Sequence, residues 1–346
     1  MRRLGRLITW VLATAILTTA CDEPLQPPQE SNPRLDVAGP TAETDIEGAV
    51  LNYSDLTTVS AEGSVSADTR PGVVLPAALA TRLGTSNNTH PLYWPVSSMW
   101  PSMRYQQVFL GSEVGTNRLF SELCLRVSYV STTGQRRVTL KLGTTDRDHT
   151  TIGTVYDENY SSSPLTVFSG VVTIDPITGG GINDFSPCFP FSDIYLHQSA
   201  NLIVELAVEP EGEWHWGYWD ACDGHHEDGC TTSRLYNFHA QSTAGWVTWN
   251  YGLVMKLIQA SAEDALQALM DEVTDLELNR GLQQALSTTL GRVMANLSDN
   301  PQQAVQDLRV FILQVEGMRH SPFLDSEADR LIAYAEAIID AINAGV

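Results

Sequence analysis

The densest group of potential metal ligands in the sequence lies in one short stretch, residues 220–230. The side chains that would bind a metal there are Asp220, Asp223, His225, His226 and Asp228. Carboxylate oxygens at this density suit calcium, and two imidazoles beside carboxylates suit zinc or copper. The stretch lacks the regular Asp-x-Asp-x-Asp-Gly spacing of a calcium loop. The alternative is therefore a solvated hairpin tip that a disulfide closes, and no other cofactor is predicted.

A row of aromatic residues immediately precedes this stretch. Trp214, Trp216 and Tyr218 alternate along the chain, so a strand would place them on one face, with His215 and Trp219 on the other. If this row is exposed, it would form a flat platform on which sugar rings stack. If it is buried, it would be part of the sandwich core. The predicted ligand-binding residues are Trp214, Trp216, Tyr218 and Trp219. Three later residues could extend either interpretation, namely Trp246, Trp249 and Tyr251.

The sequence predicts no catalytic residues. It contains no His-Glu-x-x-His, no Gly-x-Ser-x-Gly and no phosphate-binding glycine loop. A glycosidase needs only two suitably spaced carboxylates, which the 41 Asp and Glu residues could supply without a recognisable motif. A carbohydrate-active enzyme is therefore the third functional hypothesis, behind two non-catalytic ones.

The charge of the chain excludes one class of partner. With 20 Lys and Arg against 41 Asp and Glu, the formal charge is −21, so phosphate backbones are repelled and no nucleic-acid partner is expected. A hydrophobic share of 43% is too high for a disordered chain of this length. We therefore expect most of the 346 residues to fold.

The first 20 residues have the pattern of an export signal. Three arginines precede an apolar run of about eleven residues, which is shorter than the roughly 20 that a membrane-spanning helix needs. The small residues before Cys21 resemble the lipobox of bacterial lipoproteins, which implies that Cys21 is acylated and becomes the mature N-terminus. Because Thr18 stands where a lipobox usually has leucine, a plain signal peptide is the alternative.

Removal of this signal would leave 17 Lys and Arg against 41 Asp and Glu, a charge of −24. An anionic leaflet would repel that surface, so acyl groups would have to anchor the protein. We expect an exported protein, attached to the membrane on its extracytoplasmic side.

The four remaining cysteines predict two disulfides, since an even number is usual in exported chains. Three pairings are possible. Cys222 with Cys230 is favoured because the residues between them form a turn, which leaves Cys124 with Cys188. A zinc site of four thiolates is the alternative, but it lacks any Cys-x-x-Cys spacing.

The chain divides into four parts by its residue pattern. After the signal, residues 21–88 are rich in Pro, Ser, Thr, Glu and Gly and predict a tether, of which 73–75 could add a strand to the next part. Residues 89–259 show short runs of period two, which predict an antiparallel β-sandwich of jelly-roll or immunoglobulin-like topology. In the run 119–129, the odd positions, Leu119, Leu123, Leu125, Val127 and Tyr129, are expected to share one face.

Residues 261–346 change to a period of 3.6 and predict a bundle of four amphipathic helices. The second helix is expected after Asn279, the third after Asn300 with Pro301 at its first position, and the fourth at Ser326, which resembles a capping box.

Two resemblances add to this interpretation. The runs Gly281-Leu-Gln-Gln-Ala-Leu286, Ala304-Val-Gln-Asp-Leu-Arg-Val-Phe-Ile312 and Ala328-Asp-Arg-Leu-Ile332 resemble the FIMAH domain, a C-terminal helical module of exported bacterial proteins. That resemblance implies an accessory module without catalytic residues. The strand region resembles a β-domain of exported bacterial proteins, some with PEP-CTERM tails, through Arg104-Tyr-Gln-Gln-Val-Phe109, Thr166-Val-Phe-Ser-Gly170 and Asn201-Leu-Ile-Val-Glu205.

The leading hypothesis is a non-catalytic exported lipoprotein whose β-sandwich recognises a ligand at the cell envelope. That ligand would be a glycan or another envelope protein. The alternative is a structural accessory subunit of an extracytoplasmic membrane complex.

Overall fold

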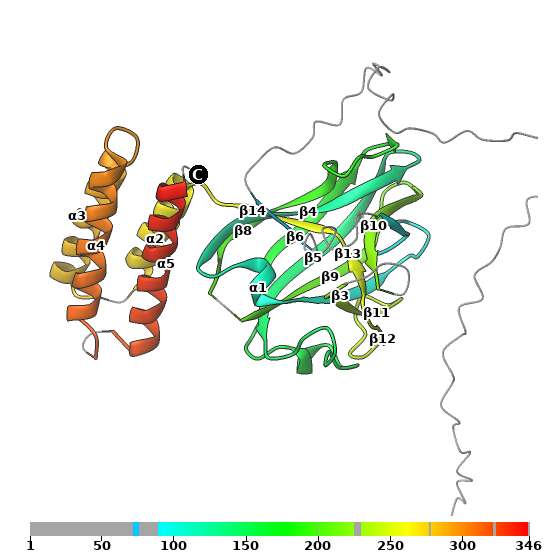
Figure 1. The fold of residues 1–346 in the computed structure, drawn as a ribbon, viewed down its shortest axis with the longest axis horizontal. Helices are drawn as coiled ribbons and strands as arrows, with labels where there is room; N and C mark the ends of the chain where they lie inside the picture. Colours follow the sequence, from blue (N-terminus) through cyan, green and yellow to red (C-terminus); the bar gives the residue numbers. More distant parts are fainter. Residues whose placement is uncertain are drawn as a thin grey trace, which may run out of the picture. The chain divides into compact units, whose positions relative to one another are not determined.

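The computed structural model describes residues 72–75, 89–198, 200–224, 230–276, 278–320 and 323–344. The predicted signal, Cys21 and most of the predicted tether lie outside these residues. Figure 1 shows strands followed by helices along the chain. The expected fold class, an antiparallel β-sandwich followed by a helical bundle, is confirmed.

Two antiparallel sheets form the sandwich (Figure 1). Within the described residues, one sheet has eight strands. These are β1 (Gly72–Leu75), β2 (His90–Leu92), β4 (Arg118–Val130), β7 (Ile177–Thr178), β8 (Phe185–His197), β10 (Gly217–Asp223), β13 (Tyr251–Leu253) and β14 (Met255–Gln259). The other has six, in the order β12 (Trp246–Thr248), β11 (Ser233–Asn237), β3 (Met103–Phe109), β9 (Asn201–Glu211), β5 (Gly134–Thr145) and β6 (Leu165–Ile174). Strand β1 pairs with β14, so residues 73–75 do add a strand.

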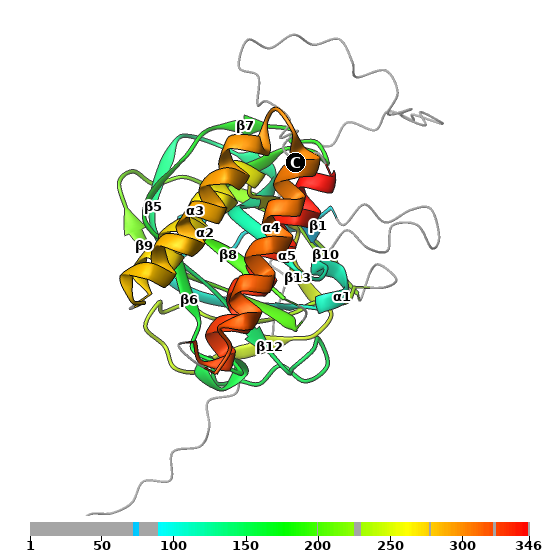
Figure 2. The same cartoon turned by 90° about the vertical axis from the view of Figure 1, so that its left-hand side faces the viewer.

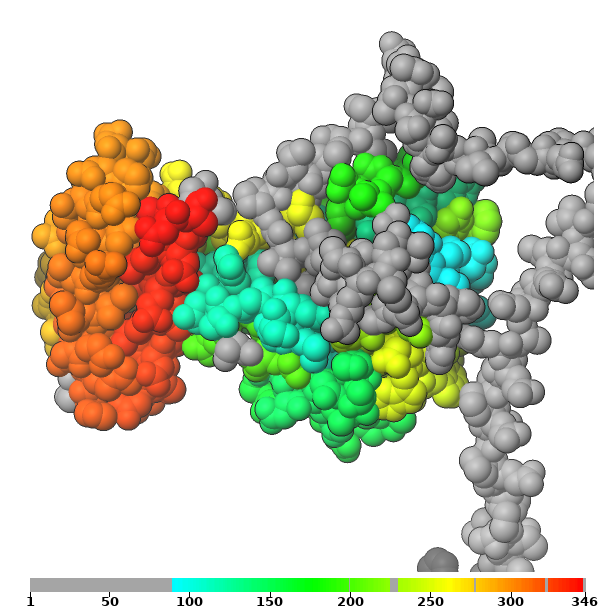
Figure 3. Space-filling model, viewed as in Figure 1, coloured from blue at the N-terminus to red at the C-terminus, as the bar shows by residue number. Residues whose placement is uncertain are grey.

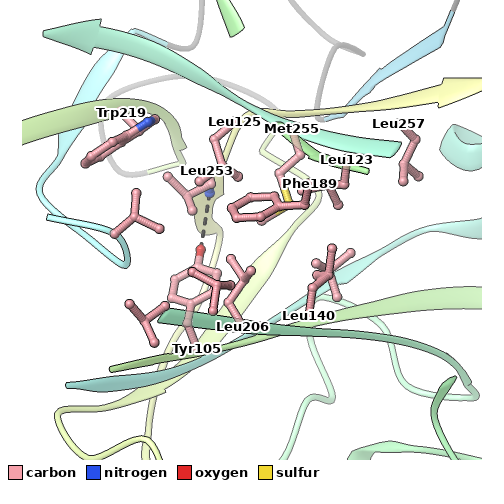
Figure 4. Close-up of a cluster of buried hydrophobic side chains, with 14 of the residues drawn as sticks. Tyr105, Leu123, Leu125, Leu140, Phe189, Leu206, Trp219, Leu253, Met255 and Leu257 are labelled. Carbon is pink, nitrogen blue, oxygen red and sulfur yellow. Dashed lines mark hydrogen bonds between the residues drawn. The ribbon is translucent and has the colours of Figure 1, made fainter. Parts of the chain in front are cut away.

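The core lies between the two sheets. Figure 4 shows Trp219, Leu125 and Met255 from one sheet pointing toward Tyr105, Leu206 and Leu140 from the other. The hydroxyl of the buried Tyr105 donates to the Gln107 side chain, at 2.5 Å, and lies 3.3 Å from the backbone nitrogen of Leu253. Apolar burial between the sheets supplies most of the stability, at roughly 25 cal/mol per Å² of apolar surface removed from water.

Strand β4 contains two β-bulges that change which side chains enter this core. Its register against β14 skips Ser121, and its register against β10 skips Ser128. Each extra residue reverses the alternation of faces beyond it. Leu123, Leu125 and Val127 enter the core as expected, but Phe120 and Val130 enter it in place of Leu119 and Tyr129. The expectation that all five odd positions share a face was therefore wrong for Leu119 and Tyr129; Leu119 belongs to the apolar cluster of the helices.

Both disulfides have the favoured pairing. Cys124 in β4 lies directly opposite Cys188 in β8 and is bonded to it, and Cys222 in β10 is bonded to Cys230. The two bonds indicate an oxidising, extracytoplasmic compartment.

Four long helices follow the sandwich: α2 (Ala262–Asp275), α3 (Arg280–Leu297), α4 (Pro301–Gly317) and α5 (Asp325–Ala344). Figure 2 shows α3 and α4 side by side. Consecutive helices pack together and α2 also contacts α5, which closes a four-helix bundle. In Figure 3 the visible surface of the bundle comes mainly from α4 in orange and α5 in red. Among the described helices, none is both long and apolar enough to cross a membrane.

The helix starts follow local capping chemistry. The side chains of Ser261, Asn279 and Asn300 each accept a hydrogen bond from a backbone N–H in the first turn. Ser326, the expected cap of α5, instead lies inside that helix. The carboxylate of Glu327 accepts a hydrogen bond from the backbone nitrogen of Leu324, so the helix begins at Asp325, two residues earlier than a cap at Ser326 predicts.

A buried histidine makes the stability of the sandwich depend on pH. His197, at the end of β8, is fully buried, and neither of its ring nitrogens has a hydrogen-bond partner within the described ranges. Burial lowers the pKa of His197 to about 4, against the ordinary value of 6.5. The unfolded chain therefore binds a proton at a higher pH than the folded chain does. The contribution of this residue is complete above pH 6.5 and is lost as the pH falls toward 4.

We predict that His197→Phe flattens the pH dependence of unfolding between pH 4 and 6.5, because the aromatic volume is kept and the titrating group is removed. As the pH falls across that interval, the free energy of unfolding of the wild-type chain should decrease by roughly 3 kcal/mol more than that of the variant. Urea unfolding at several pH values measures the difference. Parallel pH profiles for the two proteins would contradict the assignment.

Candidate functional site: an aromatic surface patch

Four aromatic side chains from three segments meet on the outer face of the eight-stranded sheet. We call Tyr93, Tyr129, Trp216 and Tyr218 the aromatic patch. Tyr93 stacks on Trp216 with ring centroids 5.9 Å apart, and Tyr129 stacks on Tyr218 at 5.4 Å. The two stacked pairs cross at about 70°, since Trp216 and Tyr218 make an angle of 70°. The patch is therefore a ridged surface rather than the flat platform expected of an exposed aromatic row.

The strand geometry brings these rings together. Tyr218 lies opposite Tyr129 in the β10–β4 ladder, and the bulge at Ser128 turns Tyr129 to the outer face. Tyr93 follows β2, which pairs with the same strand β10. Between Trp216 and Tyr218 lies Gly217, where a Cβ atom would come within 2.8 Å of the Tyr129 carbonyl oxygen. A side chain at position 217 would push β10 away from β4 and separate the rings.

The rings of the patch are accessible to solvent. Tyr93 is 36% exposed, and Tyr129, Trp216 and Tyr218 are half-buried. Trp214 lies near Trp216 in the chain and is 65% exposed. Burial, with smaller contributions from Tyr93, Tyr129 and Asp220, raises the pKa of Tyr218 above its ordinary value. The Tyr218 hydroxyl therefore stays protonated at neutral pH and can donate a hydrogen bond.

Trp219 does not belong to this surface, so its assignment as a ligand-binding residue was wrong. Its side chain is 0% exposed and packs in the core, where its indole nitrogen donates to the carbonyl oxygen of Ser186 at 2.6 Å. His215 is buried as well, with its ring nitrogens 2.8 Å from the Ser98 hydroxyl and 2.9 Å from the Val96 carbonyl oxygen. These two residues do face away from Trp216 and Tyr218, as the period-two pattern predicted.

Only part of the aromatic row lies in the strand, because β10 begins at Gly217, so Trp214 and Trp216 precede it. Of the three later aromatic residues, Tyr251 packs in the core. Trp246 joins a separate group of rings around Tyr236, and Trp249 is exposed. None of the three extends the patch within the described residues.

The predicted metal ligands fall partly outside the described residues, which is the case for His225, His226 and Asp228. Asp220 is buried in an ion pair with Arg126, at 2.8 Å, and also accepts a hydrogen bond from Ser128. Asp223 is buried 3.7 Å from His90. In the described part of the chain, the one group of three close potential ligands is Glu122, Cys124 and Cys188, whose sulfurs are joined in the disulfide. A calcium or zinc site in the 220–230 loop stays a prediction.

Two members of the patch, Tyr93 and Tyr129, were not among the ligand-binding residues predicted from the sequence. Tyr129 was expected on the same face as Leu123, Leu125 and Val127, because nothing in the sequence marks Ser128 as an extra residue in the ladder. Tyr93 precedes Trp94 and Pro95 in a segment without strand periodicity. The one usable signal was Pro95, two residues later, since proline is common in turns.

Comparison with protein-family models and with curated proteins found no match. The fold and the site therefore define this protein only as a disulfide-bonded β-sandwich with a four-helix bundle and an aromatic surface patch.

We predict different effects on stability for two neighbouring tryptophans. Trp219→Ala should lower the free energy of unfolding by about 3–5 kcal/mol, because it opens a cavity in the core. Trp214→Ala should change it by less than about 0.5 kcal/mol, because the side chain is mostly exposed. Chemical denaturation of the two variants tests the assignment of faces, and equal effects would refute it.

Proposed function

We propose that this protein is a non-catalytic, exported lipoprotein whose β-sandwich binds a glycan through the aromatic patch. The observation that carries the proposal is the patch itself: four rings in mutual contact on an outer sheet face, three of them bearing hydroxyl groups. An aromatic ring presents a flat apolar face to the C–H groups of a sugar, and a phenol can bond to its hydroxyls. A contiguous exposed aromatic surface is unusual on a soluble domain without a binding role.

The location in this proposal draws on the two disulfides and on the sequence before residue 72. The disulfides favour an extracytoplasmic site of action. Acylation of Cys21 would hold the sandwich near a membrane, with the residues between Cys21 and strand β1 as the connection. The four-helix bundle, through its resemblance to the FIMAH domain, would be an accessory module rather than a second binding domain.

The shape of the patch suggests how a glycan would bind. Tyr93 and Trp216 have nearly parallel rings, with an interplanar angle of 18°, and offer one stacking direction. Tyr129 and Tyr218 offer a second direction, across the first. A polysaccharide whose successive rings rotate along the chain would fit such crossed pairs better than a flat crystalline surface would.

We predict that Trp216→Ala abolishes retention of the full chain on a polysaccharide that retains the wild-type protein, with cellulose, chitin and peptidoglycan as the polymers compared. Trp216 contacts Tyr93, Tyr129 and Tyr218, so its loss removes the centre of the patch. Affinity electrophoresis should show at least tenfold weaker binding, about 1.4 kcal/mol. The matched control is Trp249→Ala, an exposed tryptophan outside the patch, which should bind like the wild type.

Unchanged retention of folded Trp216→Ala would reject the proposal. The alternative, a structural accessory subunit, then requires that the protein co-purifies at fixed stoichiometry with one membrane complex after mild detergent extraction. That result would leave the patch as part of a protein interface.

A further inference from the structure

Arg234 occupies an unusual position inside a second group of aromatic rings. It lies in β11, next to the edge strand β12, and is only 3% exposed. Its guanidinium carbon is 4.1 Å from the ring centre of Tyr251, 4.8 Å from that of Trp94 and 5.1 Å from that of Tyr236. Three rings therefore surround a buried cation.

Two of the three guanidinium nitrogens of this cation lack a hydrogen-bond partner in the described residues. Nε and Nη1 of Arg234 are buried, and neither contacts an acceptor anywhere in the described chain. Arg104, on the neighbouring strand β3, provides the contrast. Its Nε and Nη2 each lie 3.1 Å from a carboxylate oxygen of Glu205, and its Nη1 donates to the Ser242 carbonyl oxygen.

This difference has an energetic consequence. A buried charge without a hydrogen-bond partner is strongly unfavourable, and contacts with ring faces offset only part of that cost. A carboxylate from outside the chain would offset the rest, because the planar guanidinium edge matches its two oxygens, as Arg104 and Glu205 show. The arrangement therefore favours binding of an anionic ligand by the guanidinium group of Arg234.

The rings around Arg234 continue to the surface. Trp94 lies 4.5 Å from Tyr236, which lies 5.9 Å from Trp246, and Phe238 contacts all three rings. Trp246 is 38% exposed in the edge strand β12. At this edge Trp246 is the exposed ring of the group, and the guanidinium group of Arg234 is buried.

We propose that Arg234 and the rings of Trp94, Tyr236 and Trp246 form a subsite for a uronic acid unit of an acidic polysaccharide. The guanidinium group binds the carboxylate, and the rings stack on the sugar. The inference rests on the proposed glycan-binding function and deepens it by naming the class of sugar. Tyr93 of the aromatic patch and Trp94 of this subsite are consecutive residues of the chain.

The charge of the protein restricts how such a ligand is held. At −21 the chain repels a polyanion at long range, but at physiological ionic strength that repulsion is screened beyond about 8 Å. A desolvated guanidinium group acts at contact distance, where its attraction is strong. Recognition would therefore depend on this one cation and not on a basic surface.

The test is isothermal titration calorimetry of the full chain, in mild detergent, with D-galacturonate and D-glucuronate against galactose and glucose. We expect at least one uronate to bind at least tenfold more tightly than its neutral counterpart. Arg234→Met should abolish this preference while it keeps much of the side-chain volume. Arg234→Lys should keep only part of it, since an ammonium group cannot form the paired contact. Arg137→Met, which removes an exposed cation from β5, is the control of equal charge and should behave like the wild type.

A uronate preference that persists in folded Arg234→Met, or the absence of any preference in the wild type, would overturn the inference. If Arg234→Met does not fold, Trp246→Ala decides, because it keeps the cation and removes a stacking face. It should weaken uronate binding at least tenfold, and unchanged binding would overturn the inference. Failure of the proposed glycan-binding function can be distinguished from failure of this inference. It would appear as unchanged polysaccharide retention in Trp216→Ala, whatever the response to uronates.

Discussion

The pairing of strand β4 is the constraint on which the sandwich and its surface depend. On one side β4 pairs with β8 and β7, and on the other with β14 and β10. The bulges at Ser121 and Ser128 divide the strand into three stretches with different faces toward the core. The middle stretch is covalently fixed to β8 through Cys124 and Cys188. A ladder without the second bulge would bury Tyr129 and leave Tyr218 without its stacking partner, so the aromatic patch exists because of one extra residue.

The same ladder explains why adjacent residues of β10 have opposite roles. Trp219 faces Leu92 across the β2 pairing and fills the core, whereas Tyr218 faces Tyr129 on the outside. Packing of Trp219 in the core fixes the position of β10, and β10 in turn fixes the position of the Tyr218 ring. The position of the patch therefore depends on core packing. Because the rings are already ordered, ligand binding would carry only a small entropic cost for ordering them.

The features that the sequence predicted well are local or repeat with a regular period. Asn279 and Asn300 cap helices because a side chain and a backbone group three residues apart suffice for that contact. The cysteine pairs followed from their number and from one short loop. The bulge at Ser128 and the position of Tyr93 depend on partners far along the chain, which no local pattern encodes. The role of Arg234 was not predicted for the same reason. The rings around it come from Trp94, Tyr236 and Tyr251, and only the folded structure shows that its Nε and Nη1 have no acceptor among the described residues.

The few cations of this chain lie disproportionately in its interior. Arg104, Arg126, Arg136, Arg234 and Lys256 are all buried in the sandwich, although the sequence has only 20 Lys and Arg. Arg104 and Arg126 are paired there with Glu205 and Asp220. The outer surface is consequently short of positive charge, so it has little electrostatic attraction for an anionic membrane. This supports the proposal that acyl groups, rather than basic side chains, attach the protein. Of the arginines in the described residues, Arg234 has two buried nitrogens, Nε and Nη1, that no carboxylate or carbonyl occupies, which is why we propose it as the cation that recognises an anionic ligand at contact distance.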